Sequence, residues 1–316
     1  MIRLVLRRLA ELALTLLLVS LVIFIVMNAL PGDSAAVMLG TSARPDTLAA
    51  LRHELGLDQP LVWRYLAWIG GVLTGRFGTS LTYGVPVAGL VAERIAVTLP
   101  LAAIAIAIAV AIAVPLGVAA AARPNRPVDA GAMGFAQLAL AVPNFWIGLV
   151  AILVFSSLLG WLPAGGFPGW QAGVWPALTA LVLPAVALAL PQAGVLTRVT
   201  RTAVAEVLGD DFIRTAQAKG LSARRTLWRH AVPNALVPII TILGLQFTFL
   251  VAGAVLVENV FNLPGLGRLA YQALAQRDLV VMQAVVLILA ALVIVVNFLV
   301  DLSYLVLDPR VRDAEP

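Results

Sequence analysis

The chain has 316 residues, of which 61% are hydrophobic and only 12% are charged, and its mean hydropathy is +1.00. Soluble globular domains contain about 45–50% apolar and about 25% charged residues, so this composition excludes a soluble protein and predicts an integral membrane protein. We interpret the net charge of +5 as a sign of membrane orientation and not of nucleic-acid binding.

Side chains suited to metal or nucleophile chemistry are sparse. The sequence has no Cys, and its two His residues, His53 and His230, lie far apart, so we expect no disulfide, metal site or catalytic site. Lys219 is the only lysine and lies between Ala218 and Gly220. A Walker A loop requires Gly-Lys followed by Ser or Thr to hold nucleotide phosphates and magnesium. If ATP drives this protein, another polypeptide therefore binds the ATP, and this chain is expected to be non-catalytic and free of cofactors.

The first membrane span is predicted at residues 9–30, after a basic N-terminus of residues 1–8. A secretory signal peptide is the alternative interpretation, because it also begins with basic residues and continues with an apolar run. The apolar region of a signal peptide is roughly 7–15 residues long and precedes a cleavage site with small residues. The run here is longer and ends in Asn28-Ala29-Leu30-Pro31-Gly32-Asp33, which favours a retained transmembrane helix.

Residues 31–96 form a more polar loop in which two short helices are expected. Pro45 stands where the first turn of a helix tolerates proline, and leucines recur after it at helical spacing. A second amphipathic segment follows Pro60 and contains aromatic residues that suit a membrane–water interface, Trp63, Tyr65 and Trp68. The loop is either a cap packed on the membrane helices or a surface that contacts an external partner.

Five further spans follow, since a membrane helix needs about 20 mostly apolar residues. They are Val97–Ala122, Met133–Leu159, Trp175–Thr197, Ala235–Val257 and Gln283–Leu307. Alternating Ala and Ile in the first of them is no sign of a strand, because an unpaired strand cannot satisfy its backbone in lipid. The predicted fold is an all-α membrane protein with six transmembrane helices, a transmembrane core at 97–307 and a C-terminal tail at 308–316.

Five polar side chains within these spans are candidates to line a transport pathway. Their amides and hydroxyls can both donate and accept hydrogen bonds, so they can contact a polar solute. These candidates are Gln137, Asn144, Gln192, Gln246 and Thr248. Asn144 follows Pro143, which is expected to kink the third span. A hydrogen bond between two helices is the alternative role for this asparagine.

The distribution of positive charge predicts the orientation of the chain. Six spans place both termini on one side, and the segments on that side carry 14 Lys and Arg residues. The short loops on the opposite side carry two, Arg268 and Arg277. Because cytoplasmic loops are enriched in Lys and Arg, both termini and the stretch 198–234 are predicted to be cytoplasmic.

The stretch 198–234 is the most polar segment between two spans and carries seven of the 21 Lys and Arg residues. Negative charge at Asp210–Asp211 favours a helix start, and Gly220 stands at the C′ position, where a left-handed residue is common. A second helix is expected over Ser222–His230, capped by the serine, with Pro233 just after it. The stretch is either a solvated basic loop or a rigid knob that docks into a partner, and the capped helices favour the knob.

The segment Arg214–Leu221 reads Arg-Thr-Ala-Gln-Ala-Lys-Gly-Leu. It resembles the coupling loop of the permease subunits of ATP-binding-cassette (ABC) importers, which has the form E-A-A, three residues, Gly, nine residues, Ile, one residue, Leu-Pro. With Gly220 as the anchor, Arg214-Thr215-Ala216 occupy the E-A-A positions. His230, Val232 and Pro233 occupy the Ile, Leu and Pro positions. The departures from E-A-A and Ile are typical of the dipeptide, oligopeptide and nickel branch of that family.

Shorter motifs extend the resemblance over nearly the whole chain. In order they are Leu30-Pro31-Gly32-Asp33, Leu55-Gly56-Leu57-Asp58-Gln59-Pro60, Phe77-Gly78-Thr79-Ser80, Pro143-Asn144-Phe145-Trp146, Glu258-Asn259-Val260-Phe261, Pro264-Gly265-Leu266-Gly267 and Asp308-Pro309-Arg310. Each motif alone is weak, but together and in this order they are similar to the first of the two permeases in such importers.

The resemblance implies a type I importer permease fold and a multi-pass location in a bacterial or archaeal cytoplasmic membrane. The implied partners are a second homologous permease, two ABC ATPase subunits (or one two-headed ATPase) that hold ATP and Mg, an external solute-binding protein and membrane lipid, with no nucleic acid. The knob at 210–233 would dock into an ATPase cleft. The implied docking residues are Asp211, Arg214, Thr215, Ala216, Lys219, Gly220, Arg224, Arg225 and Pro233.

Two rival functions and several substrates remain open from the sequence. An ion-coupled secondary transporter would use an ionisable residue within the membrane, and Asp301 is the best candidate for it. A membrane scaffold or receptor is the second rival, and the kinked, Pro-rich third and fourth spans disfavour it. For an importer of this branch, di- and oligopeptides are the default substrate, and nickel chelates, glutathione and haem are the alternatives.

Overall fold

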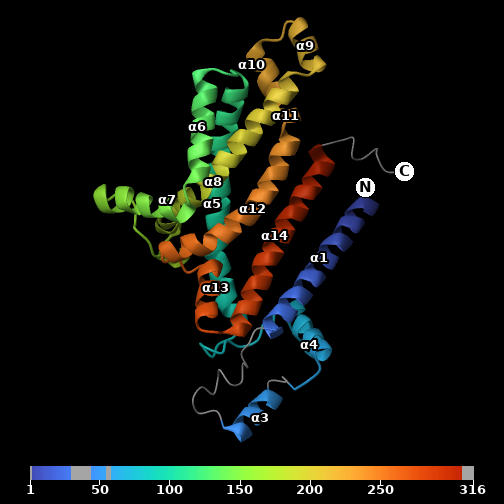
Figure 1. Cartoon of the computed structure of the whole chain (residues 1–316), viewed down its shortest axis with the longest axis vertical. Helices are drawn as coiled ribbons and strands as arrows, with labels where there is room; N and C mark the ends of the chain where they lie inside the picture. Colours follow the sequence, from blue (N-terminus) through green and yellow to red (C-terminus); the bar gives the residue numbers. More distant parts are fainter. Residues whose placement is uncertain (1, 30–43, 55–57, 308–316) are drawn as a thin grey trace. The chain divides into compact units, whose positions relative to one another are not determined.

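The computed structural model describes residues 2–29, 44–54 and 58–307, and its elements are helices joined by short loops (Figure 1). The described chain separates into two compact units that share the long helices α5 and α14. Unit 1 contains residues 98–263 and α14 from Val295 onward, and unit 2 contains residues 2–97 and 264–294. Three of the motifs used above, at residues 30–33, 55–60 and 308–310, lie wholly or partly outside the described residues.

Five continuous helices are long and apolar enough to cross a membrane. They are α1 (Ile2–Ala29), α5 (Val87–Ala121), α8 (Val174–Leu208), α12 (Leu236–Val260) and α14 (Leu279–Leu307). Each coincides with one of the predicted spans. The all-helical membrane fold expected from the composition is therefore confirmed.

The third predicted span has a different form from the single kinked helix expected over Met133–Leu159. Two helices replace it, α6 (Pro127–Ala141) and α7 (Asn144–Ala151), and α7 continues into a π-helical segment, η2 (Ile152–Leu158). The two parts are bent by 98°, so the chain has six spans only if this bent pair counts as one. Proline disfavours helical backbone at the residue before it, and Val142 is accordingly extended, with φ −100° and ψ 125°. Pro143 is extended as well, with ψ 141°, and this completes the break.

Several helices extend beyond the predicted spans. Helix α5 begins at Val87, inside the predicted external loop, and α8 continues to Leu208, inside the predicted coupling loop. Each has 35 residues, which corresponds to about 52 Å at 1.5 Å per residue, well beyond the ~30 Å hydrocarbon core. Helix α13 (Leu266–Ala275) was not predicted, because the Asn, Pro and Gly residues around it indicated a loop.

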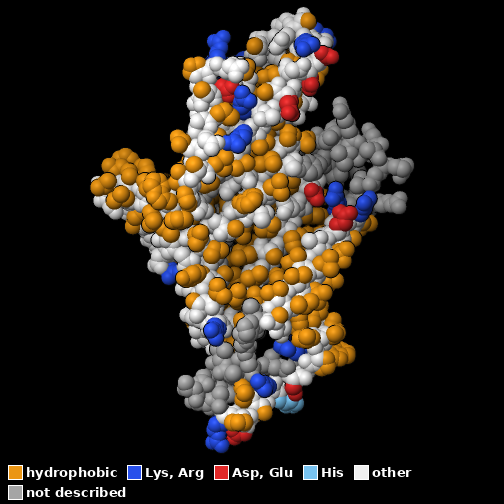
Figure 2. Space-filling view, in the orientation of Figure 1, with side chains coloured by type: hydrophobic (Ala, Val, Ile, Leu, Met, Phe, Trp, Pro, Cys, Tyr) orange, Lys and Arg blue, Asp and Glu red, His pale blue; other side chains and the backbone are white. Residues whose placement is uncertain are grey.

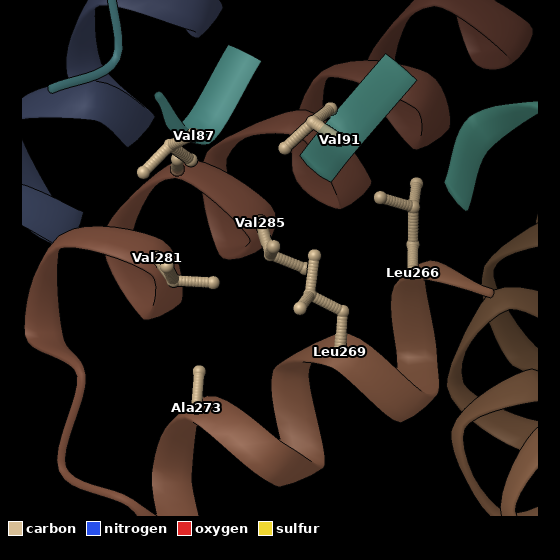
Figure 3. Close-up of a cluster of buried hydrophobic side chains, with 8 residues drawn as sticks. Val87, Val91, Leu266, Leu269, Ala273, Val281 and Val285 are labelled. Atoms are coloured by element: carbon tan, nitrogen blue, oxygen red, sulfur yellow. The ribbon is translucent and has the colours of Figure 1, made fainter. Parts of the chain in front are cut away.

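Unit 2 is built around α5, α13 and the start of α14. Figure 3 shows their side chains pointing into one buried cluster, formed by Val87, Val91, Leu266, Leu269, Ala273, Val281, Ala284 and Val285. The two short helices expected in the external loop are present as α3 (Pro45–Glu54) and α4 (Leu61–Leu73). Helix α4 packs on α1 through aromatic contacts, because the Phe24 ring lies 5.4 Å from that of Tyr65 and 5.8 Å from that of Trp68.

Unit 1 is a bundle in which α8 packs against α6, α7 and α12. Phe261, at the end of α12, is fully buried, and its ring leaves no room for a side chain at Gly148 of α7. Its carbonyl accepts a hydrogen bond of 2.7 Å from the backbone N–H of Gly166. One turn earlier, the fully buried Glu258 accepts a hydrogen bond of 2.7 Å from the hydroxyl of Thr98. The end of α12 is thereby joined to α5, to α7 and to the loop that precedes α8.

Candidate functional site: the loop between α8 and α12

The loop after α8 folds as two short helical segments around a glycine corner. The first is α9 (Asp211–Ala218). The second consists of α10 (Ala223–Thr226), the π-helical turn η4 (Leu227–Ala231) and α11 (Val232–Asn234). Figure 1 shows α9 and α10 at the end of unit 1 where the α5–α6 turn also lies. The helix–corner–helix expected from the sequence is confirmed.

Gly220 makes the corner with a left-handed backbone, at φ +84°. Its N–H donates to the carbonyl of Gln217 at 2.9 Å, and the N–H of Leu221 donates to the carbonyl of Ala216 at 3.3 Å. This pair of bonds is a Schellman motif, in which the C′ residue is left-handed and is usually glycine. The assignment of Gly220 to the C′ position is therefore correct, and the motif terminates α9.

Two details of the predicted caps differ from the structure. Ser222 has the extended backbone of an N-cap, but within the described residues its hydroxyl makes no capping hydrogen bond. Pro233 does not follow the second helix, since helical backbone continues to Asn234. Pro233 lies in the first turn of α11, where proline is tolerated.

Eight of the nine predicted docking residues are exposed, and the exception is Ala216. Ala216 and Ile213 form the buried side of α9, so Ala216 packs against its own subunit. Asp211 pairs locally with the Arg214 guanidinium at 3.3 Å, and both side chains are largely exposed. The hydroxyl of Thr215 donates to the carbonyl of Asp211 at 3.0 Å, which leaves its lone pairs for a partner.

Two exposed aromatic side chains on this loop were not identified from the sequence as docking residues. Phe212 is 43% exposed and Trp228 is 50% exposed. Large aromatic residues on a polar surface are typical of protein interfaces, where they supply apolar contact area. The sequence could have indicated them, because two large aromatic residues within a basic stretch are unusual unless a partner covers them. Figure 2 shows Lys, Arg, Asp and Glu side chains gathered around this end of unit 1.

The second segment anchors the loop to the bundle. Thr226, Ala231 and Val232 are buried, and both η4 and α11 contact α8. Arg224, Arg225 and Arg229 are exposed on the same segment. The loop therefore has one buried side that fixes it to α8 and one charged side that remains accessible.

The five candidate pathway residues do not form one group. Gln192 and Gln246 meet at a cavity of about 10 Å³ between α5, α8 and α12, which has room for about one water molecule. Asn144 begins α7 and lies against Gly253 of α12. Gln137 accepts a hydrogen bond of 3.0 Å from Arg198, and Thr248 is exposed on α12. A cavity of this size cannot admit a dipeptide.

Comparisons with known proteins cover nearly the whole chain. Residues 113–313 match the family model of the inner membrane component of binding-protein-dependent transport systems, and residues 1–102 match the model of its N-terminal region. A putative peptide transport system permease of Brucella abortus is 41% identical, with 98% of each chain covered. A probable peptide ABC transporter permease of Sinorhizobium fredii is 39% identical, also with 98% of each chain covered.

One further relative and one solved structure widen the comparison. The glutathione transport system permease of Salmonella choleraesuis is 39% identical, with 99% of each chain covered. Among solved structures, the inward-facing MetNI methionine ABC transporter matches with a TM-score of 0.57 at 19% identity, over 69% of this chain and 96% of that one. This last likeness shows the shared fold. The chain belongs to the inner membrane components of binding-protein-dependent transport systems: it is a non-catalytic, multi-pass permease subunit of an ABC importer, and ATP hydrolysis belongs to separate ATPase subunits.

Proposed function

We propose that this chain is the first of two permeases in an importer of di- and oligopeptides, and that residues 210–233 couple it to the ATPase. The observation that carries the coupling role is the two-sided loop. Thr226, Ala231 and Val232 fix it to the bundle, and the exposed Arg224 and Arg225 are accessible to a partner. The left-handed corner at Gly220 keeps the loop narrow enough to enter a cleft.

The proposed assembly contains a second homologous permease, two ATPase subunits or one two-headed ATPase, and an external solute-binding protein. Both termini and the coupling loop are cytoplasmic in this proposal, because 14 Lys and Arg residues lie on that side against two in the short loops opposite. Helix α1 exposes a row of apolar side chains, including Leu14, Leu18 and Val22, which suits contact with lipid or with the second permease.

Peptides are the proposed substrate class because three similar permeases carry peptide or glutathione transport in their names, and glutathione is itself a small peptide. Nickel chelates and haem remain the competing substrates for this architecture. The binding protein that co-purifies with the chain would decide between them. Calorimetry with di- to pentapeptides, glutathione, nickel chelates and haem would measure the affinity of the binding protein for each. Tight binding of haem or a nickel chelate, without measurable binding of any peptide, would refute the peptide proposal.

Affinity purification of the tagged chain in mild detergent tests the assembly. Mass spectrometry should find a second permease, one or two ATPases and a binding protein. Reversal of charge on the coupling loop, Arg224→Glu with Arg225→Glu, should release the ATPases and retain the second permease. The matched control is Arg123→Glu with Arg126→Glu, two exposed arginines on the neighbouring α5–α6 turn. Retention of the ATPases by the loop variant, or their equal loss from the control, would contradict docking through this loop.

A further inference from the structure

Asp129 and Arg201 form a bidentate ion pair between α6 and α8 that the transport function described so far does not use. Arg201 Nε lies 2.6 Å from Asp129 Oδ1, and Arg201 Nη2 lies 2.7 Å from Oδ2. The Asp129 side chain is only 6% exposed. Its Oδ2 also accepts a hydrogen bond of 3.0 Å from the N–H of Asn125, which is left-handed at φ +59°. One carboxylate thus joins the α5–α6 turn, the first turn of α6 and the C-terminal part of α8.

Close helix contacts on either side of the ion pair hold the same three helices together. A β-carbon on Gly117 of α5 would lie 2.6 Å from the Thr200 side chain of α8. A β-carbon on Gly194 of α8 would lie 2.9 Å from the Ala136 carbonyl of α6. Small residues at such positions allow helix backbones to approach closely. The ion pair therefore lies within a tightly packed block and not on a loosely held surface.

The coupling loop is attached directly to this block. Helix α8 ends at Leu208, and only Gly209 and Asp210 separate it from α9. Figure 1 shows α6 beside α8, and the contacts between the two helices are extensive. At its other end, α6 meets the bend at Val142–Pro143 that leads into α7. A displacement of the loop that moved α8 would reach the α6–α7 bend through α6 if α6 moved with α8, in addition to the direct contact between α8 and α7.

We propose that the Asp129–Arg201 pair acts as a positioning clamp that makes α6 and α8 move as one lever, so that displacement of the coupling loop is transmitted to the α6–α7 bend. The clamp rests on the proposed role of that loop. Removing one partner of a buried ion pair leaves an uncompensated charge and strongly destabilises a protein, whereas replacing both partners by uncharged residues of similar volume avoids that cost. A variant that neutralises both partners should therefore still fold, so that a loss of coupling in it reports the transmission of movement and not misfolding.

The test uses the assembled complex in proteoliposomes with its binding protein and a mixture of tri- and pentapeptides as the transport probe. The ratio of peptide uptake to ATP hydrolysed is measured for wild type and for Asp129→Asn with Arg201→Gln. We expect at least a tenfold fall in this ratio, with assembly retained, and substantial recovery in the swapped variant Asp129→Arg with Arg201→Asp. The control is Glu11→Gln, which removes an exposed carboxylate paired with Arg7 and Arg8 on α1 and should leave the ratio unchanged.

A structural role alone would reduce the yield of the complex, ATP hydrolysis and uptake together, and the ratio would stay constant. An unchanged ratio in a fully assembled neutral variant would overturn the clamp.

A second readout needs no transport substrate: spin labels at Leu138→Cys on α6 and Gln217→Cys on α9, both exposed positions, report the distance between the lever and the loop. We expect one narrow distance in wild type with and without ATP and vanadate, and a broadened distribution in the neutral variant. A wild-type complex without ATP-driven uptake would instead refute the proposed function.

Discussion

At Gly220 a single residue fixes the direction of the coupling loop through its backbone. Among the described atoms, a β-carbon at this position would lie in open space, so the φ of +84°, and not a clash, opposes substitution. The left-handed region costs an ordinary L-residue about 1–2 kcal/mol. We therefore expect Gly220→Val to distort the corner and to lower peptide uptake per ATP while the protein remains inserted and assembled. Gly220→Asn is the matched control, because Asn tolerates left-handed backbone better. Normal coupling in an assembled Gly220→Val complex would contradict this role.

His53 supplies a pH-dependent contact outside the membrane spans. Its Nδ1 lies 2.7 Å from Asp58 Oδ2, and this hydrogen bond, together with the negative charge of Asp58, raises the pKa of His53. The same hydrogen bond lowers the pKa of Asp58. The stability that protonated His53 gains from this contact is fully present below the pKa of His53 in the unfolded chain. It is lost as pH rises through the raised pKa of His53 in the folded chain. The stability that ionised Asp58 gains from the contact is present above the pKa of Asp58 in the unfolded chain. It is lost as pH falls through the lowered pKa of Asp58 in the folded chain.

Replacement of Asp58 by Asn should return the pKa of His53 toward its ordinary value. An NMR titration of the histidine ring in wild type and Asp58→Asn would measure the change. Asp46→Asn is the control, since Asp46 pairs with Arg44 and should leave the pKa of His53 where it is. An identical His53 titration in wild type and Asp58→Asn would show that the contact does not form in solution.

Local sequence patterns identified some of these residues, but they did not identify contacts between residues that are distant in the sequence. Gly220 was assigned correctly because a helix C-terminus is determined by a few consecutive residues. The contacts Thr98–Glu258 and Asp129–Arg201 join residues on different helices, and nothing in the spacing of either pair indicates that they meet. Ala216 was placed in the docking set by its motif position, and only the packing of α9 shows that it is buried.

At the scale of helices, α14 begins with a cap that also holds the segment before α5. Asp278 is 1% exposed, and its Oδ1 accepts from the N–H of Val281 at 3.1 Å. Its Oδ2 accepts from the Ser80 hydroxyl at 2.5 Å and from the Thr82 N–H at 3.1 Å. Asp278→Ala would remove the cap and leave buried donors unpaired, a cost on the order of 2 kcal/mol. The thermal unfolding midpoint in detergent should therefore fall. Asp46→Ala, in the exposed first turn of α3, is the control, and an equal change in both variants would contradict the capping role.

Helix existence could be predicted from apolar length, whereas helix ends and bends could not. Long apolar runs predicted α1, α5, α8, α12 and α14 because a bilayer imposes a minimum length. Pro143 predicted a disturbance, but the sequence did not show that both Val142 and Pro143 would leave the helical conformation and turn a kink into a 98° break. Helix α13 was missed since its buried face, Leu266, Leu269 and Ala273, is too short to stand out from the polar residues around it.

At the scale of the whole molecule, composition alone decided the class of protein, and ordered motifs decided the family. The substrate pathway was beyond sequence reasoning, because in the proposed assembly it depends on a second permease that this sequence does not contain. The separate locations of Gln137, Asn144 and Thr248 within unit 1 illustrate this point. Polar residues in a membrane helix serve packing inside one subunit as readily as they serve transport.

The orientation of the chain in the membrane can be tested directly, because the sequence has no cysteine and single introduced thiols report one position each. Ser222→Cys lies on the coupling loop and Gln276→Cys lies between α13 and α14, and both positions are exposed. In intact spheroplasts, a membrane-impermeant maleimide should label Gln276→Cys and should label Ser222→Cys only after permeabilisation. The cysteine-free wild type is the control for background labelling. Because ATP is cytoplasmic, labelling of Ser222→Cys from outside would exclude this loop as the ATPase contact, whatever its resemblance to coupling loops.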